Sequence, residues 1–169
     1  MYAFFKRILD LLLSSVALVI LLPIFIPVML ILKLTGEGEV FYFQERIGIN
    51  NSNFYIWKFA TMLRDSMSIG TGSITLENDF RVTKVGKILR KTKINELPQI
   101  INILKGDISL VGPRPLVTKT FSAYSKEVQS KIYNVKPGLT GIGSIIFRDE
   151  ESIISSVKNE DPHEFYKRV

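Results

Sequence analysis

Residues 11–32, LLLSSVALVILLPIFIPVMLIL, contain no charged side chain and decide how the rest of the chain has to be arranged. About 20 apolar residues are enough for a helix to cross the hydrocarbon core of a bilayer. A helix of a soluble domain would carry a polar face, and this run has none. The run is also long for a secretory signal peptide, and no small-residue cleavage site follows it. The segment therefore predicts a membrane helix.

Two features of this segment bear on how it meets the membrane. Pro23 and Pro27 lie in its second half, where each removes a backbone donor and predicts a sharp bend. Lys6 and Arg7 precede the run and Lys33 follows it, so positive charge flanks both ends. Hydropathy alone favours a kinked spanning helix, whereas charge at both ends favours a re-entrant helix whose two ends stay in the cytoplasm. The residues by themselves leave both topologies open.

The composition of the 169-residue chain limits its chemistry. The length suits one compact domain, and the absence of cysteine together with a lone histidine, His163, argues against disulfides, thiolate sites and histidine metal clusters. A metal ion would therefore need oxygen ligands, as Mg²⁺ does. The formal net charge of +6 suits nucleic acid, anionic lipid or a phosphorylated substrate. The apolar N-terminus and the lack of a recognition motif disfavour nucleic acid.

Residue patterns beyond the apolar run predict an α+β domain that is mostly helical. A β-hairpin is predicted over residues 39–59, where aromatic residues flank a turn. Residues 66–78 are rich in Gly, Ser and Thr and predict a flexible surface loop, since they lack the Gly-Lys of a phosphate-binding loop. Residues 121–134 predict a helix, and the apolar residues 142–147 predict a strand.

A basic stretch at residues 84–93, KVGKILRKTK, stands directly before a second predicted helix. Apolar residues within 97–104 recur at helical spacing, and Gly106 is expected to end that helix. Asn95 is suited to cap its start. A helix N-terminus next to Arg90 favours an anion, phosphate above all.

The segment Gly112-Pro113-Arg114-Pro115 holds one arginine between two prolines. The guanidinium of Arg114 suits a bidentate phosphate contact, and a stiff mount lowers the entropy lost on binding. A plain rigid turn is the alternative, and the residues alone do not decide between the two.

Taken in order, these motifs resemble those of the bacterial sugar transferases, the monotopic phosphoglycosyl transferases. The resemblance extends over nearly the whole chain, from the apolar N-terminus with its two prolines to the last motif. It is specific because the motifs occur together. They are FQERIG at 43–48, WKF at 57–59, LRKTKINELPQ at 89–99, LKGDISLVGPRP at 104–115 and PGLTG at 137–141.

The resemblance implies an activity and a location. Members of this family transfer a sugar-1-phosphate from a UDP-sugar to polyprenyl phosphate with Mg²⁺ and release UMP, a first membrane step in glycoconjugate or polysaccharide assembly. It implies a re-entrant helix over residues 1–33 and a cytoplasmic transferase domain over residues 34–169, at the inner membrane of a bacterium. Membrane lipids are expected partners. The identity of the sugar and the formation of a homodimer are left open.

The site residues implied by the resemblance include one departure from the family pattern. Glu96 is expected to be catalytic and to bind the metal, while Lys58, Arg90, Pro113 and Arg114 are expected to bind substrate.

The departure is Asn95, which stands where the family has the aspartate thought to form a covalent phosphosugar. An amide has no anionic oxygen with which to attack phosphorus. Three explanations remain open: Glu96 takes over as nucleophile or base, the chain is an inactive relative that binds substrates or a partner, or Asn95 is an engineered trap. Two further differences are Ala60, where an arginine is usual, and an end at Val169 that suggests a truncated or shorter variant.

Overall fold

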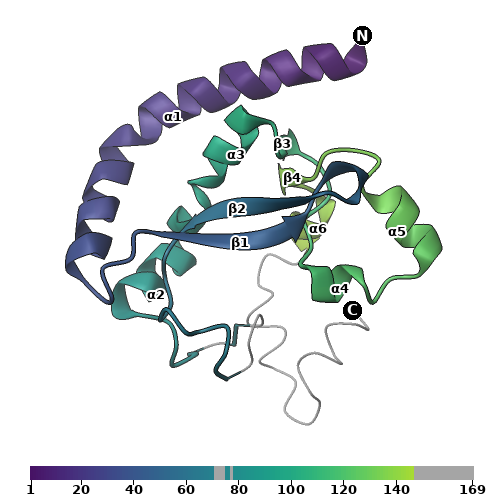
Figure 1. Cartoon of the computed structure of the whole chain (residues 1–169). Coiled ribbons are helices and arrows are strands. Elements are labelled where there is room, and N and C mark those ends of the chain that lie inside the picture. The colour runs from purple at the N-terminus through teal and green to yellow at the C-terminus, as the bar shows by residue number, and fades with distance from the viewer. Residues whose placement is uncertain (71–74, 77, 147–169) are drawn as a thin grey trace.

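A computed structural model describes residues 1–70, 75, 76 and 78–146, so that Phe147 and His163 lie outside the described residues. The fold is α+β with about half of the chain helical, and a long N-terminal helix arches over two small sheets and several short helices (Figure 1). The elements in order are α1 (Tyr2–Leu34), β1 (Phe41–Ile47), η1 (Ile49–Asn51), β2 (Asn53–Phe59), α2 (Lys84–Lys91), η2 (Ile94–Glu96), α3 (Gln99–Lys105), β3 (Ser109–Val111), α4 (Thr118–Phe121), α5 (Lys126–Ile132), β4 (Gly138–Thr140) and α6 (Ile142–Ile146).

Helix α1 passes through both of its prolines without a break, and the sharp bend predicted there stays a prediction. It is one continuous helix through Pro23 and Pro27, and Figure 1 shows it curving around the rest of the molecule. Each proline removes a single backbone hydrogen bond, and the bonds on either side keep the helix intact while it bends. By length and composition α1 can cross a membrane.

One face of α1 lies against the domain along most of the helix. Asp10, Ser14, Phe25, Val28 and Leu32 are its buried residues, and they recur every three or four positions or at multiples of that spacing. The remaining faces are apolar and exposed. Only 17% of the most apolar 18-residue stretch of the helix is buried. A surface of this kind marks contact with a membrane or another protein.

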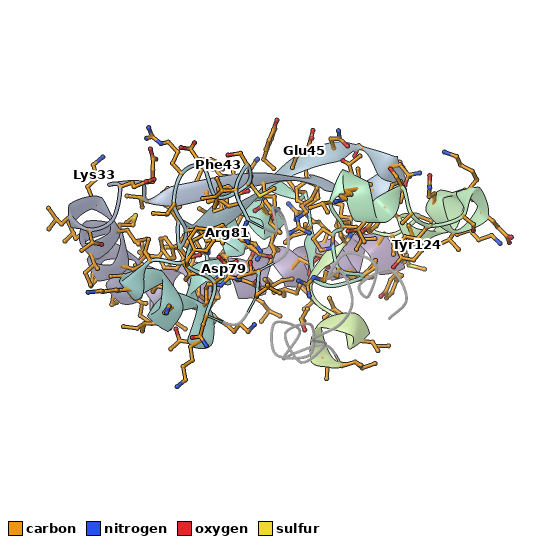
Figure 2. All side chains as sticks on the ribbon, turned by 90° about the horizontal axis from the view of Figure 1, so that it is seen from below. Lys33, Phe43, Glu45, Asp79, Arg81 and Tyr124 are labelled. Atoms are coloured by element: carbon orange, nitrogen blue, oxygen red, sulfur yellow. The ribbon has the colours of Figure 1, made fainter. Side chains whose placement is uncertain are left out.

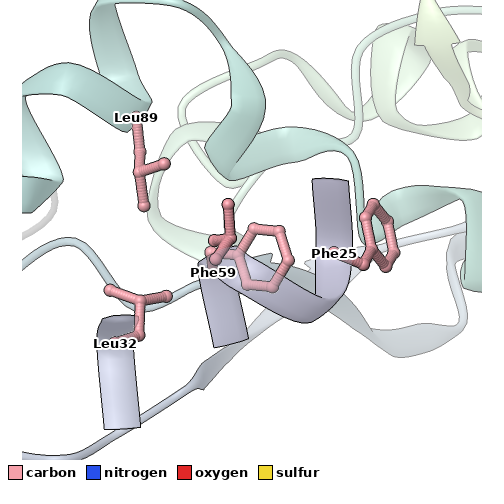
Figure 3. Close-up of a cluster of buried hydrophobic side chains, with 5 residues drawn as sticks. Phe25, Leu32, Phe59 and Leu89 are labelled. Carbon is pink, nitrogen blue, oxygen red and sulfur yellow. The ribbon is translucent and has the colours of Figure 1, made fainter. Parts of the chain in front are cut away.

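The predicted hairpin is confirmed as β1 and β2, which pair antiparallel from Phe41↔Phe59 to Ile47↔Asn53. Its base is sealed against α1 and α2 by a buried apolar cluster that includes Phe25, Phe59 and Leu89 (Figure 3). The Phe25 and Phe59 rings pack edge to face, with their centroids 5.4 Å apart. The second half of α1 is thereby fixed to the strand that carries Lys58.

The chain beyond residue 117 differs from the sequence prediction. The helix predicted over 121–134 is two helices, α4 and α5, separated by residues 122–125. The strand predicted over 142–147 is the helix α6 as far as Ile146. Strand β4 comes earlier and pairs in parallel with β3, where Val111↔Thr140 is the last pair, so the apolar run after it has no strand partner among the described residues.

The described part of the loop predicted to be flexible is held by a buried arginine. Arg81 is fully buried, and its guanidinium donates to the carboxylate of Asp79 and to the carbonyls of Ser66 and Ile69. Hydrogen bonding from Arg81 holds the pKa of the Asp79 carboxyl below its ordinary value. Figure 2 shows the two side chains together beneath the hairpin. The residues on both sides of the undescribed segment 71–74 are therefore anchored.

Candidate active site

The centre of the candidate site is an ion pair between strand β2 and the turn η2. Lys58 Nζ lies 3.5 Å from Glu96 Oε1, with side chains 19% and 37% exposed. Strand pairing positions Lys58 opposite Tyr42, and the 3-10 turn at Ile94–Glu96 places Glu96 beside it. Two residues far apart in the sequence are thus brought together, both of them predicted site residues.

The charges around this pair are mostly positive. The pKa of the Lys58 ammonium is lowered to about 8, chiefly by burial and also by the charges of Arg46, Arg114 and Arg90, while Glu96 opposes them. The predicted site residues Arg90 and Arg114 are therefore close enough to act on Lys58. Arg46 was not predicted as a site residue.

Glu96 responds to the same charges in the opposite sense. Burial alone would raise the pKa of its carboxyl, but the positive charges of Lys58, Arg114 and Lys93 outweigh burial and the pKa is lowered. Glu96 is consequently an anion at neutral pH. The site combines an ionised carboxylate with an excess of positive charge, which suits a ligand that carries more than one negative charge.

The position of β2 at this site depends on Asn102, a fully buried side chain of α3. Its Oδ1 accepts from the Trp57 amide at 2.9 Å, and its Nδ2 donates to the Tyr55 carbonyl at 2.8 Å. Both partners lie within three residues of Lys58. Asn102 was not predicted as a site residue, because its spacing within a helix says nothing of a contact with a distant strand.

Arg114 is exposed, but the backbone that carries it is fixed from both sides. The Tyr133 hydroxyl donates to the Arg114 carbonyl and accepts from the Leu116 amide, both at 2.8 Å. Arg46 Nη1 donates to the Pro115 carbonyl at 2.9 Å. Burial raises the pKa of the Tyr133 hydroxyl to about 12, so it keeps its proton at neutral pH. The loop is therefore stiff because of these contacts as well as its prolines.

Pro113, also a predicted site residue, has its carbonyl engaged in the backbone of the domain. It accepts from the Gly138 amide at 2.9 Å, which joins the Gly112–Pro115 loop to the first residue of β4. A Cβ on Gly138 would lie 2.1 Å from the Gly112 nitrogen, so this approach requires glycine. The backbone of Pro113 thus helps to hold the loop in place.

Residues 1–163 match the model of a protein family described as bacterial sugar transferase. The chain belongs to the bacterial sugar transferase family. It is 37% identical over 147 residues to the UDP-N-acetylgalactosamine-undecaprenyl-phosphate N-acetylgalactosaminephosphotransferase of Aeromonas hydrophila, covering 86% of the chain and 34% of the relative. It is 38% identical over 143 residues to the UDP-glucose:undecaprenyl-phosphate glucose-1-phosphate transferase of Klebsiella pneumoniae, covering 83% of the chain and 30% of the relative.

A shorter relative aligns over most of both sequences. The exopolysaccharide production protein ExoY of Rhizobium meliloti (strain 1021) is 37% identical over 166 residues, with 90% of the chain and 73% of the relative covered. The chain thus spans about a third of the length of the first two relatives and most of the third.

Asn95, the residue expected to depart from the family pattern, lies beside Glu96 and is buried, with 6% exposed. It lies within η2 and does not cap α3, which begins at Gln99 with Pro98 at the cap position, so the capping prediction is wrong. The reason is that a separate 3-10 turn comes before the helix. Gly106 does end α3, in a left-handed conformation with φ of 92°. Within the described residues, Asn95 Oδ1 is a buried oxygen without a hydrogen-bond partner.

The residues present fit a magnesium ion in the way that phosphate-bound magnesium is usually held. The described residues contain no group of three or more His, Cys, Asp or Glu side chains that could form a full metal cage. Mg²⁺ commonly uses one or two carboxylates and takes its other ligands from substrate phosphates and water. Glu96 offers an ionised carboxylate, and Asn95 Oδ1 offers an amide oxygen that no other described residue hydrogen-bonds.

Proposed function

We propose that this sugar transferase moves a sugar-1-phosphate from a UDP-sugar to polyprenyl phosphate and releases UMP. The Lys58–Glu96 pair within a cluster of arginines carries the proposal, since an anionic carboxylate in a positively charged site suits the transfer of a phosphoryl group. The names of the relatives add the substrate classes, UDP-sugars and undecaprenyl phosphate. These relatives use different sugars, so the sugar is left undefined.

The cations of the site would act on the diphosphate of the UDP-sugar. Arg90 and Arg114 present guanidinium groups suited to bidentate phosphate contacts, and Lys58 adds a compact ammonium. Charge that develops on the departing UMP would be stabilised by donors already in place. Because Tyr133 and Arg46 fix the backbone around Arg114, little entropy need be lost in positioning that loop.

We assign the carboxylate chemistry to Glu96, because the amide of Asn95 cannot attack phosphorus as an anion does. In a covalent route a Glu96 oxygen bonds to the β-phosphorus as the bond between that phosphorus and the bridging oxygen breaks and UMP leaves. An oxygen of polyprenyl phosphate then bonds to the same phosphorus and releases Glu96. In a direct route an oxygen of the lipid phosphate bonds to the β-phosphorus as the bond to the bridging oxygen breaks and UMP leaves, and Glu96 would instead hold the metal.

Magnesium is proposed as the cofactor, held by Glu96 and by Oδ1 of Asn95 together with the phosphates of the substrate. Bound there, it would neutralise negative charge on the diphosphate. This role for Asn95 uses the feature in which it still resembles aspartate, a side-chain oxygen at the same position along the chain.

For the membrane we propose that α1 is re-entrant, entering and leaving at the cytoplasmic face of the inner membrane. A spanning helix would extend away from a cytoplasmic domain, whereas α1 contacts its domain from Asp10 near its start to Leu32 near its end. Lys6, Arg7 and Lys33 would remain on the cytoplasmic side. Residues 1–33 would then form the membrane segment, and residues 34–169 the transferase domain.

The test is UMP release by the full chain with undecaprenyl phosphate, Mg²⁺ and a panel of UDP-sugars. We expect turnover with at least one sugar and a loss of more than about a hundredfold in Glu96→Gln, roughly 2.7 kcal/mol in the barrier. Glu127→Gln is the matched control, since Glu127 pairs with Lys131 on exposed α5 and should have no effect. Labelled sugar retained on the denatured protein would mark the covalent route.

The same assay includes Asn95→Asp. If only that variant turns over, the chain is an inactive relative that binds its substrates, and the proposed activity is wrong. If the wild-type chain turns over and Glu96→Gln does not, the chemistry proceeds without the family aspartate.

A further inference from the structure

The start of α1 belongs to a second group of positive charges, separate from the one around Lys58. Arg7 donates from Nη1 and Nη2 to the carbonyls of Ile103 and Leu104, at 2.6 and 2.9 Å, and so covers the C-terminal end of α3. A Cβ placed on Gly106 would lie 3.2 Å from Arg7 Nη2 and 3.4 Å from Lys136 Nζ. Two cations from distant parts of the sequence therefore converge on the bare backbone of one glycine.

The carboxylates near this point already have partners. Asp10 is buried, accepts from the Ser109 hydroxyl at 2.8 Å and forms an ion pair with Lys6 at 3.5 Å. Asp107 forms an ion pair with Lys105 at 3.2 Å. Each acid is thus in an ion pair with a lysine, and neither forms an ion pair with Arg7 or Lys136 in the part of the chain that the structure describes, although both act on Lys136 from a greater distance.

Lys136 is the cation that remains. Its side chain is half-buried, and its ammonium makes no hydrogen bond or ion pair with the part of the chain that the structure describes. Burial and the charge of Arg7 lower the pKa of Lys136, with Asp10 and Asp107 opposing them. An anion between Lys136 and Arg7 would relieve this unfavourable environment. The charges that act on Lys58 and Glu96 come from other residues, so the two sites are distinct.

The position of this group along α1 identifies the kind of anion. Tyr2, Phe4 and Phe5 are exposed just before Lys6 and Arg7, and the uncharged apolar run follows directly. Aromatic and basic side chains next to an apolar segment are typical of the headgroup region of a bilayer. Phosphate groups of lipids lie at that depth.

We propose that Arg7 and Lys136 bind the phosphate of an anionic phospholipid beside Gly106, where the lack of a side chain lets both cations lie close to the backbone. The site would hold the start of α1 to the turn before β4 through a lipid headgroup. It rests on the membrane placement proposed for α1, but it requires no transferase activity. Its failure can therefore be told apart from failure of the proposed reaction.

The test is binding of short-chain phosphatidylglycerol to the full chain in uncharged detergent micelles, measured by native mass spectrometry. We expect Lys136→Gln to weaken binding about fivefold, the effect of one basic residue near an anionic lipid. Lys136→Arg should bind like the wild type. Lys126→Gln, which removes the same charge from exposed α5, should change nothing.

Three results would overturn the proposal. Equal losses in Lys136→Gln and Lys126→Gln would show that only net charge matters. Inorganic phosphate that displaces the lipid at equal concentration would show a site for free phosphate. A raised KM for polyprenyl phosphate in Lys136→Gln, with unchanged phosphatidylglycerol binding, would assign Lys136 to the substrate.

Discussion

Two ion pairs in this domain have the same chemistry and opposite surroundings. Arg81 and Asp79 meet at 2.6 Å with side chains 0% and 4% exposed, whereas Lys58 and Glu96 are 3.5 Å apart and remain partly open to solvent. Arg81 also donates to two backbone carbonyls. Around Lys58, three arginines add positive charge that Glu96 alone opposes.

The difference separates a pair that supports the fold from one that can act on a ligand. The Arg81 pair has its donors and acceptors matched within the protein, so a ligand would gain nothing by approaching it. The Lys58 pair lies in an excess of positive charge with an open side, and an incoming polyanion would complete it. Burial and charge balance therefore indicate function better than the presence of an ion pair.

The largest effect is expected from breaking the buried Arg81–Asp79 pair. Asp79→Ala removes the carboxylate that balances the buried Arg81 charge, and we expect the free energy of unfolding to fall by roughly 3–5 kcal/mol. Chemical denaturation of the full chain in detergent measures this. Asp65→Ala, which changes an exposed acid of the same segment, should cost little. Equal stability of the two variants would contradict the assignment of Asp79 to the fold.

The second largest effect is expected from removing the acid of the partly exposed Lys58–Glu96 pair. Glu96→Gln should lose more than about a hundredfold in kcat/KM yet keep its unfolding free energy within about 1 kcal/mol of the wild type. Activity and denaturation are measured on the same preparation. A variant that loses stability and activity together would make Glu96 a structural residue.

The titration of Lys58 predicts that stability and activity change with pH in opposite directions. Its pKa of about 8 in the folded chain lies below the ordinary 10.5, so between these values the folded state binds fewer protons than the unfolded state. Stability contributed at this position should therefore rise with pH in that window, while kcat/KM falls as the ammonium charge is lost. Lys58→Arg should abolish the alkaline fall in kcat/KM, because arginine stays charged. A fall that persists unchanged in Lys58→Arg would assign the titration to another group.

The smallest effect is expected from removing a contact that fixes the loop around Arg114. Tyr133→Phe removes the hydroxyl that joins the Arg114 carbonyl to the Leu116 amide, which should cost roughly 1–2 kcal/mol of stability and raise the KM for the UDP-sugar. Tyr124→Phe is the control, because Tyr124 is an exposed residue nearby. An unchanged KM would mean that the Arg114 loop holds its shape without Tyr133.

Local patterns in the sequence predicted the elements that depend on local rules. The apolar helix, the hairpin and the end of α3 at Gly106 follow from composition, turn residues and the left-handed glycine. The gathering of Lys58 and Glu96 was expected from the family resemblance. The structure confirms that they meet, while their roles stay predictions.

What the sequence could not predict depends on contacts between distant segments. Arg46, Asn102 and Tyr133 fix the site through partners between 17 and 69 residues away, and no spacing pattern signals such pairs. The run at residues 142–146 was predicted as a strand because its apolar residues suit either structure. The strand that pairs with β3 is Gly138–Thr140, which ends before that run begins.

The attachment of α1 along its length has a consequence for the kind of membrane the protein tolerates. A spanning helix adapts to a thicker or thinner bilayer by changing its tilt. Helix α1 could tilt only by giving up either the Arg7 contacts with α3 at one end or the packing of Leu32 at the other. With the membrane placement proposed for α1, the height of Lys58 and Glu96 above the lipid would be set by the chain itself, and the surrounding lipids would have to adjust to differences in bilayer thickness.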